Sequence, residues 1–209
     1  MIALVLTCRP QWQPWLLHQL AKQETEHSVV LFDDCSKPLE WKPAVTVRPN
    51  NRLQLSMGAK RQMLLDVIKT EREPFAWFDD DDWHPKERLA IGQALIDDGA
   101  TAAGYAEGTF CDVKTLQTRK LACGEAVTFN GAVFAPQCAT YTFDAINRGE
   151  DTNWLRKVLA GATVVSSPIM EHCWMSHDGN ICGRRGSMTF EGRRFDRFDS
   201  WELDFLRKL

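Results

Sequence analysis

The sequence predicts a layered α/β fold. Short apolar runs of strand length alternate with longer segments of helical periodicity, the pattern of a layered α/β protein. Acidic residues repeatedly follow the apolar runs, and ligands bind at the carboxyl ends of strands in open α/β sheets. The length of 209 residues, without internal repeats or low-complexity stretches, predicts a single domain.

The first half of the chain carries the clearest periodicity. A helix after the first strand is opened by Pro10 or Pro14, because proline is favoured at the first helical position. The next helix is indicated by Leu64, Val67 and Ile68 at helical spacing. We expect strands at 2–6, 28–32, 44–47 and 75–78, and helices at about 10–22, 55–69 and 85–97.

The second half is harder to assign. We expect strands at 101–106, 163–166 and 169–174, strand and turn at 125–134, and helices at 151–159 and 200–209. Ser200 is a candidate cap for the last helix. Residues 107–125 match no pattern, and residues 176–194, which contain four glycines, predict a loop near the site.

Composition excludes several classes of protein. The formal net charge is −3, so the molecule as a whole has no strong attraction to nucleic acids or anionic membranes. No apolar run reaches the roughly 18–20 residues of a membrane span, and the N-terminus lacks a basic signal region. The seven cysteines include no CxxC pair, which is typical of reduced thiols. We therefore expect a cytoplasmic protein.

The strongest chemical signal is four adjacent carboxylates, Asp79 to Asp82, directly after a buried strand. A like-charge pair at 4 Å costs on the order of 4 kcal/mol at an effective dielectric near 20. A bound Mg²⁺ or Mn²⁺ would remove that cost, because these cations prefer carboxylate and phosphate oxygens. The alternative is a solvated acidic turn at the start of a helix.

Two further segments place polar groups near strand ends. Asp33 and Asp34 follow the second strand and could accept hydrogen bonds from a base or a ribose, or else form an Asx turn. Lys60 and Arg61 begin a helix after Gly58 and could face a diphosphate, although basic pairs on helices are usually solvated.

The remaining motifs lie late in the chain. Glu150 and Asp151 open a helix after Gly149, where a carboxylate stays ionised and can act as a base, or simply caps the helix. His177 lies in the Gly-rich loop and could complete a cation site, although a lone histidine is more often structural.

In this order and spacing, the five segments resemble glycosyltransferase family 2 and related GT-A enzymes. The resemblance covers roughly residues 2–180 and implies a GT-A (Rossmann-like) three-layer α/β/α fold with a mixed, mostly parallel central sheet. It divides the single catalytic domain into a nucleotide-binding half (1–100), an acceptor-binding half (101–180) and a C-terminal loop and helix (181–209). Gln62 departs from the family pattern, in which asparagine is common at this position.

The resemblance also implies roles for individual residues. Asp33 and Asp34 would contact the base, Asp79 with Asp80 the nucleotide sugar, and Asp81 a Mn²⁺ or Mg²⁺ ion with His177 as a further ligand. Lys60 and Arg61 would support the nucleotide, and Asp151, with Glu150 as the alternative, would be the catalytic base. The loop itself, with its four glycines and its arginines, predicts a lid over the diphosphate that includes Asn180, Arg184 and Arg185; the alternative is a solvated basic loop packed against the C-terminal helix.

The implied activity is metal-dependent, inverting transfer of a sugar from a nucleotide sugar, most simply a UDP-sugar, to an unknown acceptor hydroxyl. The loop arginines raise a variant in which the acceptor is a modified base in viral DNA. One alternative is a nucleotidyltransferase of similar fold, disfavoured because no glycine follows the first strand. Another is a non-catalytic module that binds sugars or nucleic acids through its eight tryptophans.

Overall fold

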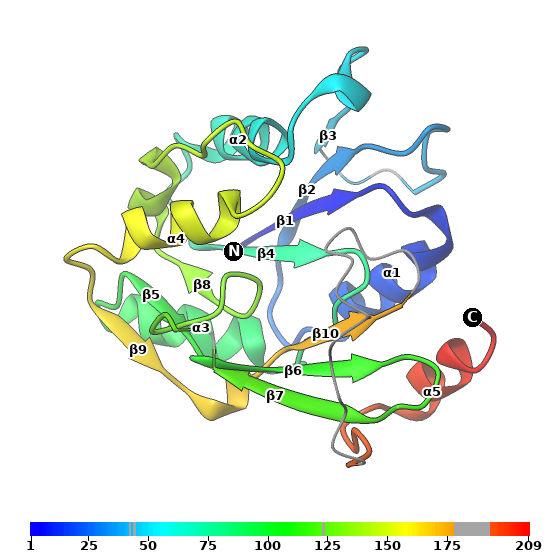
Figure 1. Cartoon of the computed structure of the whole chain (residues 1–209). Helices are drawn as coiled ribbons and strands as arrows, with labels where there is room; N and C mark the ends of the chain where they lie inside the picture. The colour runs from blue at the N-terminus through cyan, green and yellow to red at the C-terminus, as the bar shows by residue number, and fades with distance from the viewer. Residues whose placement is uncertain (42, 44, 123, 178–192) are drawn as a thin grey trace.

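The computed structural model describes residues 1–41, 43, 45–122, 124–177 and 193–209, without the side chains of 121 and 122. Its centre is a seven-stranded sheet in the order β3-β2-β1-β4-β8-β5-β9 (Figure 1). The strands are β1 (Ile2–Thr7), β2 (Ser28–Asp33), β3 (Val45–Val47), β4 (Phe75–Asp79), β5 (Ala102–Gly104), β8 (Val133–Phe134) and β9 (Val164–Ser166).

The register of the parallel strands aligns their carboxyl ends. β1 lies between β2 and β4 and is parallel to both, with Thr7 opposite Asp33 and Leu6 opposite Asp79. Only β8 runs against its neighbours β4 and β5. The acidic residues that follow β2 and β4 therefore emerge at one edge of the sheet, on either side of the end of β1.

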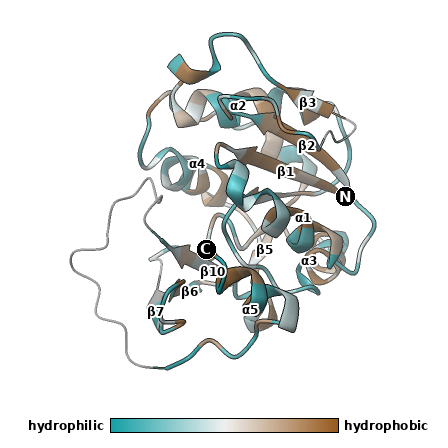
Figure 2. Cartoon of the chain, turned by 90° about the vertical axis from the view of Figure 1, so that its right-hand side faces the viewer, coloured by the Kyte–Doolittle hydropathy of each residue, from teal (hydrophilic) through white to brown (hydrophobic). Residues whose placement is uncertain are grey.

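Helices cover both faces of this sheet. α1 (Gln13–Ala21) and α3 (Arg88–Asp97) lie on one face, and α2 (Met57–Ile68) and α4 (Glu150–Leu159) on the other (Figures 1 and 2). The alternation along β8 reflects this: Val133 packs on Gly92 of α3, whereas the Phe134 ring lies 5.0 Å from Trp154 of α4. The predicted three-layer α/β/α arrangement is confirmed. None of the described helices is long and apolar enough to span a membrane.

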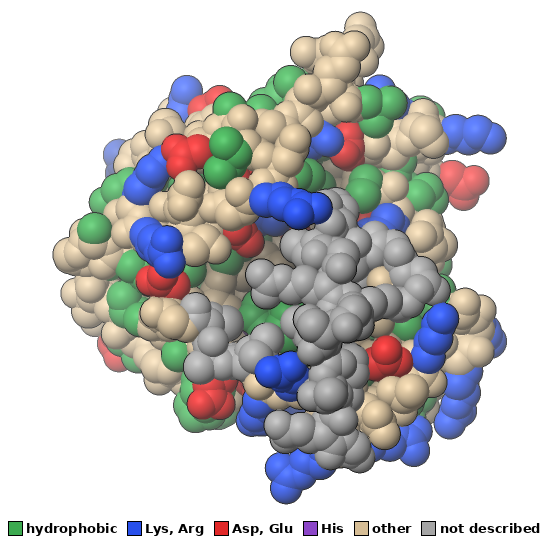
Figure 3. Space-filling view, viewed as in Figure 1, with side chains coloured by type: hydrophobic (Ala, Val, Ile, Leu, Met, Phe, Trp, Pro, Cys, Tyr) green, Lys and Arg blue, Asp and Glu red, His purple; other side chains and the backbone are tan. Residues whose placement is uncertain are grey.

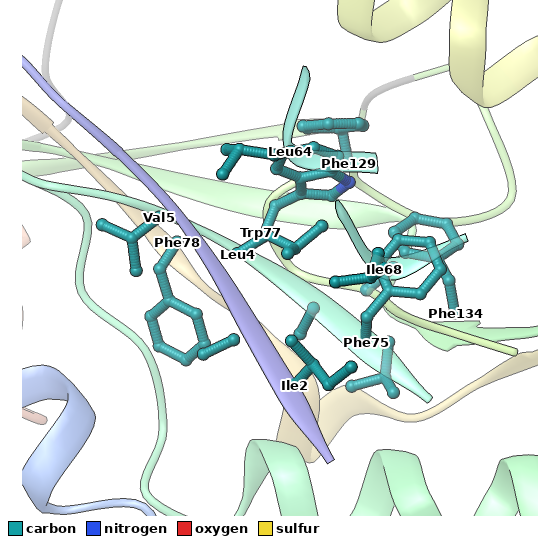
Figure 4. Packing of buried hydrophobic residues seen from close by; sticks show 14 of the residues in the cluster. Ile2, Leu4, Val5, Leu64, Ile68, Phe75, Trp77, Phe78, Phe129 and Phe134 are labelled. Carbon is teal, nitrogen blue, oxygen red and sulfur yellow. The ribbon is translucent and has the colours of Figure 1, made fainter. Parts of the chain in front are cut away.

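The main hydrophobic core lies between the sheet and these helices. Phe75 and Trp77 of β4 point toward α2 and α4 (Figure 4). On this face the Trp77 ring stacks on Phe129, with 5.3 Å between the ring centroids. Phe78 points to the opposite face and contacts His84. Because β4 is buried on both faces, its apolar run is continuous up to Asp79.

A second, three-stranded sheet packs beside the acidic edge. Its order is β10 (Cys173–Ser176), β6 (Glu107–Asp112) and β7 (Thr118–Ala122). One face, with Cys111 and Met175, joins a separate apolar cluster that also contains Trp15 and Trp83 and lies against α5 (Ser200–Leu206). Figure 2 shows this sheet beside α5, away from α2.

Several sequence predictions are corrected here. The strand expected at 169–174 is displaced, because Pro168–Met170 forms a 3-10 turn and the strand begins at Cys173. The last helix is capped by Asp199 rather than Ser200, in a capping box with Glu202. Residues 107–125, which matched no pattern, contain the β6–β7 hairpin. The expected loop at 176–194 lies largely outside the described residues.

Candidate functional site

The acidic turn lies at the carboxyl end of β4 and is mostly buried. Asp80, Asp81 and Asp82 expose 0%, 4% and 4% of their surface, so this is not the solvated turn of the alternative interpretation. The turn is attached to the small sheet, because the backbones of Trp83 and Cys173 exchange hydrogen bonds of 2.9 Å. Buried carboxylates need compensating partners.

Arg9, which sequence reasoning missed, supplies much of that compensation. Its Nε donates to Asp80 Oδ1 at 2.8 Å, and Nη1 and Nη2 donate to the two Asp81 oxygens at 2.5 and 2.6 Å. Asp80 also accepts from Thr7 Oγ1 at 2.7 Å and from the Cys8 amide at 3.2 Å. Burial alone would lower the pKa of Arg9, but Asp81 and Asp80 raise it above its ordinary value.

His177 joins the same group from the end of β10. Its Nε2 lies 2.8 Å from Asp81 Oδ2 and 3.4 Å from Arg9 Nη1, and its ring packs on Trp12 at 4.7 Å. The structure therefore brings together Asp81 and His177, the two residues predicted to bind a cation.

Asp82 and Asp79 share Asn130, a second residue that the sequence did not single out. Asn130 Nδ2 donates to Asp79 Oδ2 at 2.7 Å and to Asp82 Oδ2 at 2.9 Å. Burial, followed by the charges of Asp81 and Asp79, raises the pKa of Asp82 well above its ordinary value. A protonated Asp82 would lower the negative charge of the turn while keeping its contact with Asn130.

The two carboxylates after β2 have different environments. Asp33 accepts hydrogen bonds from the amides of Cys35 (3.0 Å) and Leu39 (3.3 Å), so it forms the Asx-type turn of the alternative interpretation. Asp34 Oδ2 instead pairs with Lys60 Nζ of α2 at 2.6 Å. Lys60 is therefore engaged with Asp34 and is buried, rather than solvated.

Arg61 connects the end of β4 to the start of α4. Its guanidinium lies 3.5 Å from Asp79 Oδ1 and 3.5 Å from Glu150 Oε1, over the rings of Phe129 (4.5 Å) and Trp77 (5.5 Å). α2 lies close to this region at Gly58, where a Cβ would come 1.8 Å from the Asp144 carbonyl oxygen and 3.3 Å from Glu150 Cβ. A larger residue at position 58 would therefore push α2 away from the start of α4.

Glu150 and Asp151 lie in the first turn of α4 but differ in exposure. Glu150 is 5% exposed and faces Arg61, and burial raises its pKa. Asp151 is half-buried, and its Oδ1 accepts a 2.7 Å hydrogen bond from the Thr152 amide. Of the two, Asp151 is the more exposed.

Four buried polar atoms at this edge lack a hydrogen-bond partner among the described residues: Asp34 Oδ1, Arg61 Nε, Arg61 Nη1 and Asn130 Oδ1. Buried polar groups are normally satisfied, so such a group of unsatisfied atoms needs an explanation. The four atoms are two acceptors and two donors that a polar ligand would satisfy.

A divalent cation fits the pair Asp81 and His177. Carboxylate oxygen and neutral imidazole nitrogen both bind Mn²⁺, and such ions take their remaining ligands from water and substrate phosphates. Arg9 Nη1 lies 2.5 Å from Asp81 Oδ2 and 3.4 Å from His177 Nε2, so a positive group already contacts both predicted ligand atoms.

The one group of three ligand atoms within 4.8 Å, among the residues described, lies elsewhere: His18, Asp199 and Glu202. Glu202 accepts from Lys22 Nζ at 2.5 Å and from Trp83 Nε1 at 3.0 Å, and it completes the cap of α5. These contacts explain the group without a metal.

Basic side chains surround the small sheet. Figure 3 shows Lys and Arg side chains in the lower part of the face around β7 and α5. Arg193 lies beside the start of β7, because its carbonyl oxygen accepts a 2.8 Å hydrogen bond from the Thr118 amide. The half-buried or exposed cations of this region are Lys114, Arg119, Lys120, Arg193, Arg194 and Arg197. The predicted lid residues Asn180, Arg184 and Arg185 lie outside the described residues.

Comparison with known proteins identifies the fold. No model of a known protein family matches the chain, and neither does any curated protein. The structure of S. aureus TarS 1-349 in complex with UDP is similar, with a TM-score of 0.61 and 15% identity over 84% of this chain. A second structure of S. aureus TarS has a TM-score of 0.55, again with 15% identity over 84% of this chain.

The chain spans 60% of the first TarS structure and 36% of the second. The likeness confirms the predicted GT-A fold, the Rossmann-like arrangement of glycosyltransferases.

Proposed function

We propose that this protein is a glycosyltransferase that moves a sugar from a nucleotide-diphosphate sugar, most simply a UDP-sugar, to an acceptor hydroxyl with inversion. The observation that carries the proposal is the convergence of Asp34, Asp79 and Asp81 at one sheet edge with unsatisfied buried polar atoms, where Arg61 connects Asp79 to the start of α4. The structurally similar TarS was solved in complex with UDP, which supports the proposal.

The nucleotide would lie across the ends of β1, β2 and β4. Asp34 Oδ1, which has no partner among the described residues, would accept from the imide of the base. Asp79, whose side chain is 28% exposed, would accept from ribose hydroxyls beside Arg61. Asp80 would act indirectly by holding Arg9, and Asp33 by shaping the turn that presents Asp34.

Asp81 and His177 would hold the divalent cation, which neutralises charge on the departing diphosphate when bound. Asp151 would take the proton from the acceptor hydroxyl as the glycosidic bond forms on the opposite face of the sugar. Glu150 would position Arg61 rather than act as the base, because it is buried against that arginine.

For the acceptor, residues 101–180 would supply the binding half, beside the basic region of the small sheet. Six cations near β7, in a chain of net charge −3, favour an acceptor with phosphate groups, and DNA carrying hydroxyl-modified bases is the candidate to test first.

The test is a screen in which the protein, with Mn²⁺, is incubated with UDP-, GDP- and TDP-sugars. We expect slow release of nucleoside diphosphate from one donor, because water can replace a missing acceptor, and faster release when the correct acceptor is added. Pyrophosphate release from a nucleoside triphosphate and a sugar 1-phosphate would instead indicate a nucleotidyltransferase. No release from any donor, with and without acceptors, would contradict the proposal.

A further inference from the structure

The Arg9 side chain already pairs with both oxygens of Asp81, the carboxylate that would bind a cation together with His177. Its Nη1 is 2.5 Å from Asp81 Oδ2 and 3.4 Å from His177 Nε2, and these two ligand atoms are 2.8 Å apart. An ion in contact with both atoms, at the roughly 2.1 Å of such bonds, would lie within about 4 Å of Nη1, so two positive groups would share the Asp81 carboxylate. Arg9 and the cation would therefore compete for Asp81 in this arrangement.

The other end of the guanidinium is held independently of Asp81. Arg9 Nε donates to Asp80 Oδ1 at 2.8 Å, and Asp80 is fully buried. Nη2 also donates to Asp80 Oδ1, and the Arg9 side chain is 15% exposed. The two contacts with Asp80 would keep the arginine at the edge when Nη1 moves away from Asp81.

When Nη1 moves away, it loses its charge-assisted hydrogen bond to Asp81. The guanidinium then needs a new acceptor. Phosphate oxygens of a donor held over Asp79 and Asp81 would provide one, since guanidinium groups bind phosphate well. The two exchanges then occur together: the cation takes Asp81 and His177, and the diphosphate takes Arg9.

We propose that Arg9 is a built-in competitor of the divalent cation, so that the metal binds tightly only together with the nucleoside diphosphate. The inference rests on the proposed cation site at Asp81 and His177. It assigns to Arg9 a positioning role that couples metal and nucleotide binding, and it makes free protein resistant to occupation by metal alone.

The experiment measures Mn²⁺ binding by the loss of the free-ion EPR signal, with and without UDP. Wild-type protein should bind Mn²⁺ weakly alone and much more tightly with UDP. Arg9→Gln should bind Mn²⁺ alone at least about tenfold more tightly than wild type, because the competing charge is gone. With UDP present the difference should shrink or reverse.

Two further variants keep the result interpretable. Arg9→Lys retains a charge near Asp80 but cannot bridge to both carboxylates, so its Mn²⁺ affinity should be intermediate. Arg52→Gln removes a cation that donates to the Cys35 and Ser36 carbonyls after β2, and it should bind Mn²⁺ like wild type. Asp80 keeps its contacts with Thr7 and two backbone amides in each Arg9 variant, which favours folding.

Equal Mn²⁺ affinity of wild type and Arg9→Gln without UDP would overturn the competition while leaving the cation site intact. Absence of Mn²⁺ binding in every variant, with and without UDP, would overturn the competition and the cation site together. UDP binding that persists in that case would leave the proposed donor site standing.

Discussion

Replacing Asp151 with asparagine is expected to lower kcat for sugar transfer by about 10²–10⁴-fold, the usual contribution of a general base. The change removes the ability to accept a proton but preserves the shape of the side chain. The asparagine oxygen can still accept the hydrogen bond from the Thr152 amide, so the start of α4 should be unchanged. Donor affinity should therefore stay within a few-fold of wild type.

The matched control is Glu150→Gln, one position earlier on the same helix. This change removes the charge that faces Arg61, so it should alter donor affinity and stability along with turnover. Turnover is measured with donor and acceptor both saturating, and donor affinity by titration. Near-normal kcat in Asp151→Asn together with a large loss in Glu150→Gln would identify Glu150 as the base.

Replacing Arg61 with methionine is expected to lower the free energy of unfolding by about 3 kcal/mol, because removing one partner of a buried ion pair leaves an uncompensated charge. Arg61 is 4% exposed, and its loss leaves the Glu150 and Asp79 carboxylates without their shared cation. The figure lies at the low end of the usual range, since the Asp79 side chain is 28% exposed. Packing on Phe129 is partly kept by methionine.

Urea unfolding at neutral pH measures the loss in free energy of unfolding caused by Arg61→Met. Lys69→Met, which removes an exposed cation near the end of α2, should cost less than about 0.5 kcal/mol and serves as the control. Arg61→Lys should lie between the two, because lysine keeps the charge but cannot reach both carboxylates in a fixed geometry. An Arg61→Met protein as stable as the Lys69→Met control would contradict the role assigned to Arg61.

Much of the site could be predicted from the sequence because it lies at strand ends. Asp34 and Asp79 each follow a continuous apolar run, and parallel strands bring such residues to one edge whatever the chain distance between them. The same rule applied to β1 would have directed attention to Arg9. Its contact with Asp80 and Asp81 could still not be read from the sequence, because it depends on the direction of a long side chain.

Other features depend on packing that has no local signal. Asn130 reaches Asp79 across 51 positions of the chain, and a single asparagine in a turn has no pattern that indicates such a contact. The β6–β7 hairpin escaped assignment because Thr109 and Cys111 point inward as small residues, while Phe110 points outward and stacks on Trp174 at 4.7 Å. The large apolar side chain of this strand therefore lies on its more exposed face, which is the reverse of the apolar-inward alternation that identifies a half-buried strand.

Calorimetric titration of the wild-type protein with UDP, in the presence of Mn²⁺ and again with a chelator, tests the central claim most directly. The account predicts saturable binding at a single site with Mn²⁺, strong weakening by the chelator, and strong weakening by Asp34→Asn but not by Asp66→Asn. Asp66 is an exposed carboxylate on the same helix as Lys60. It accepts a hydrogen bond from Gln62 and pairs with Lys69, rather than with residues of the sheet edge. Absence of UDP binding with Mn²⁺ present, or binding that Asp34→Asn leaves unchanged, would contradict a nucleotide site at the ends of β1, β2 and β4.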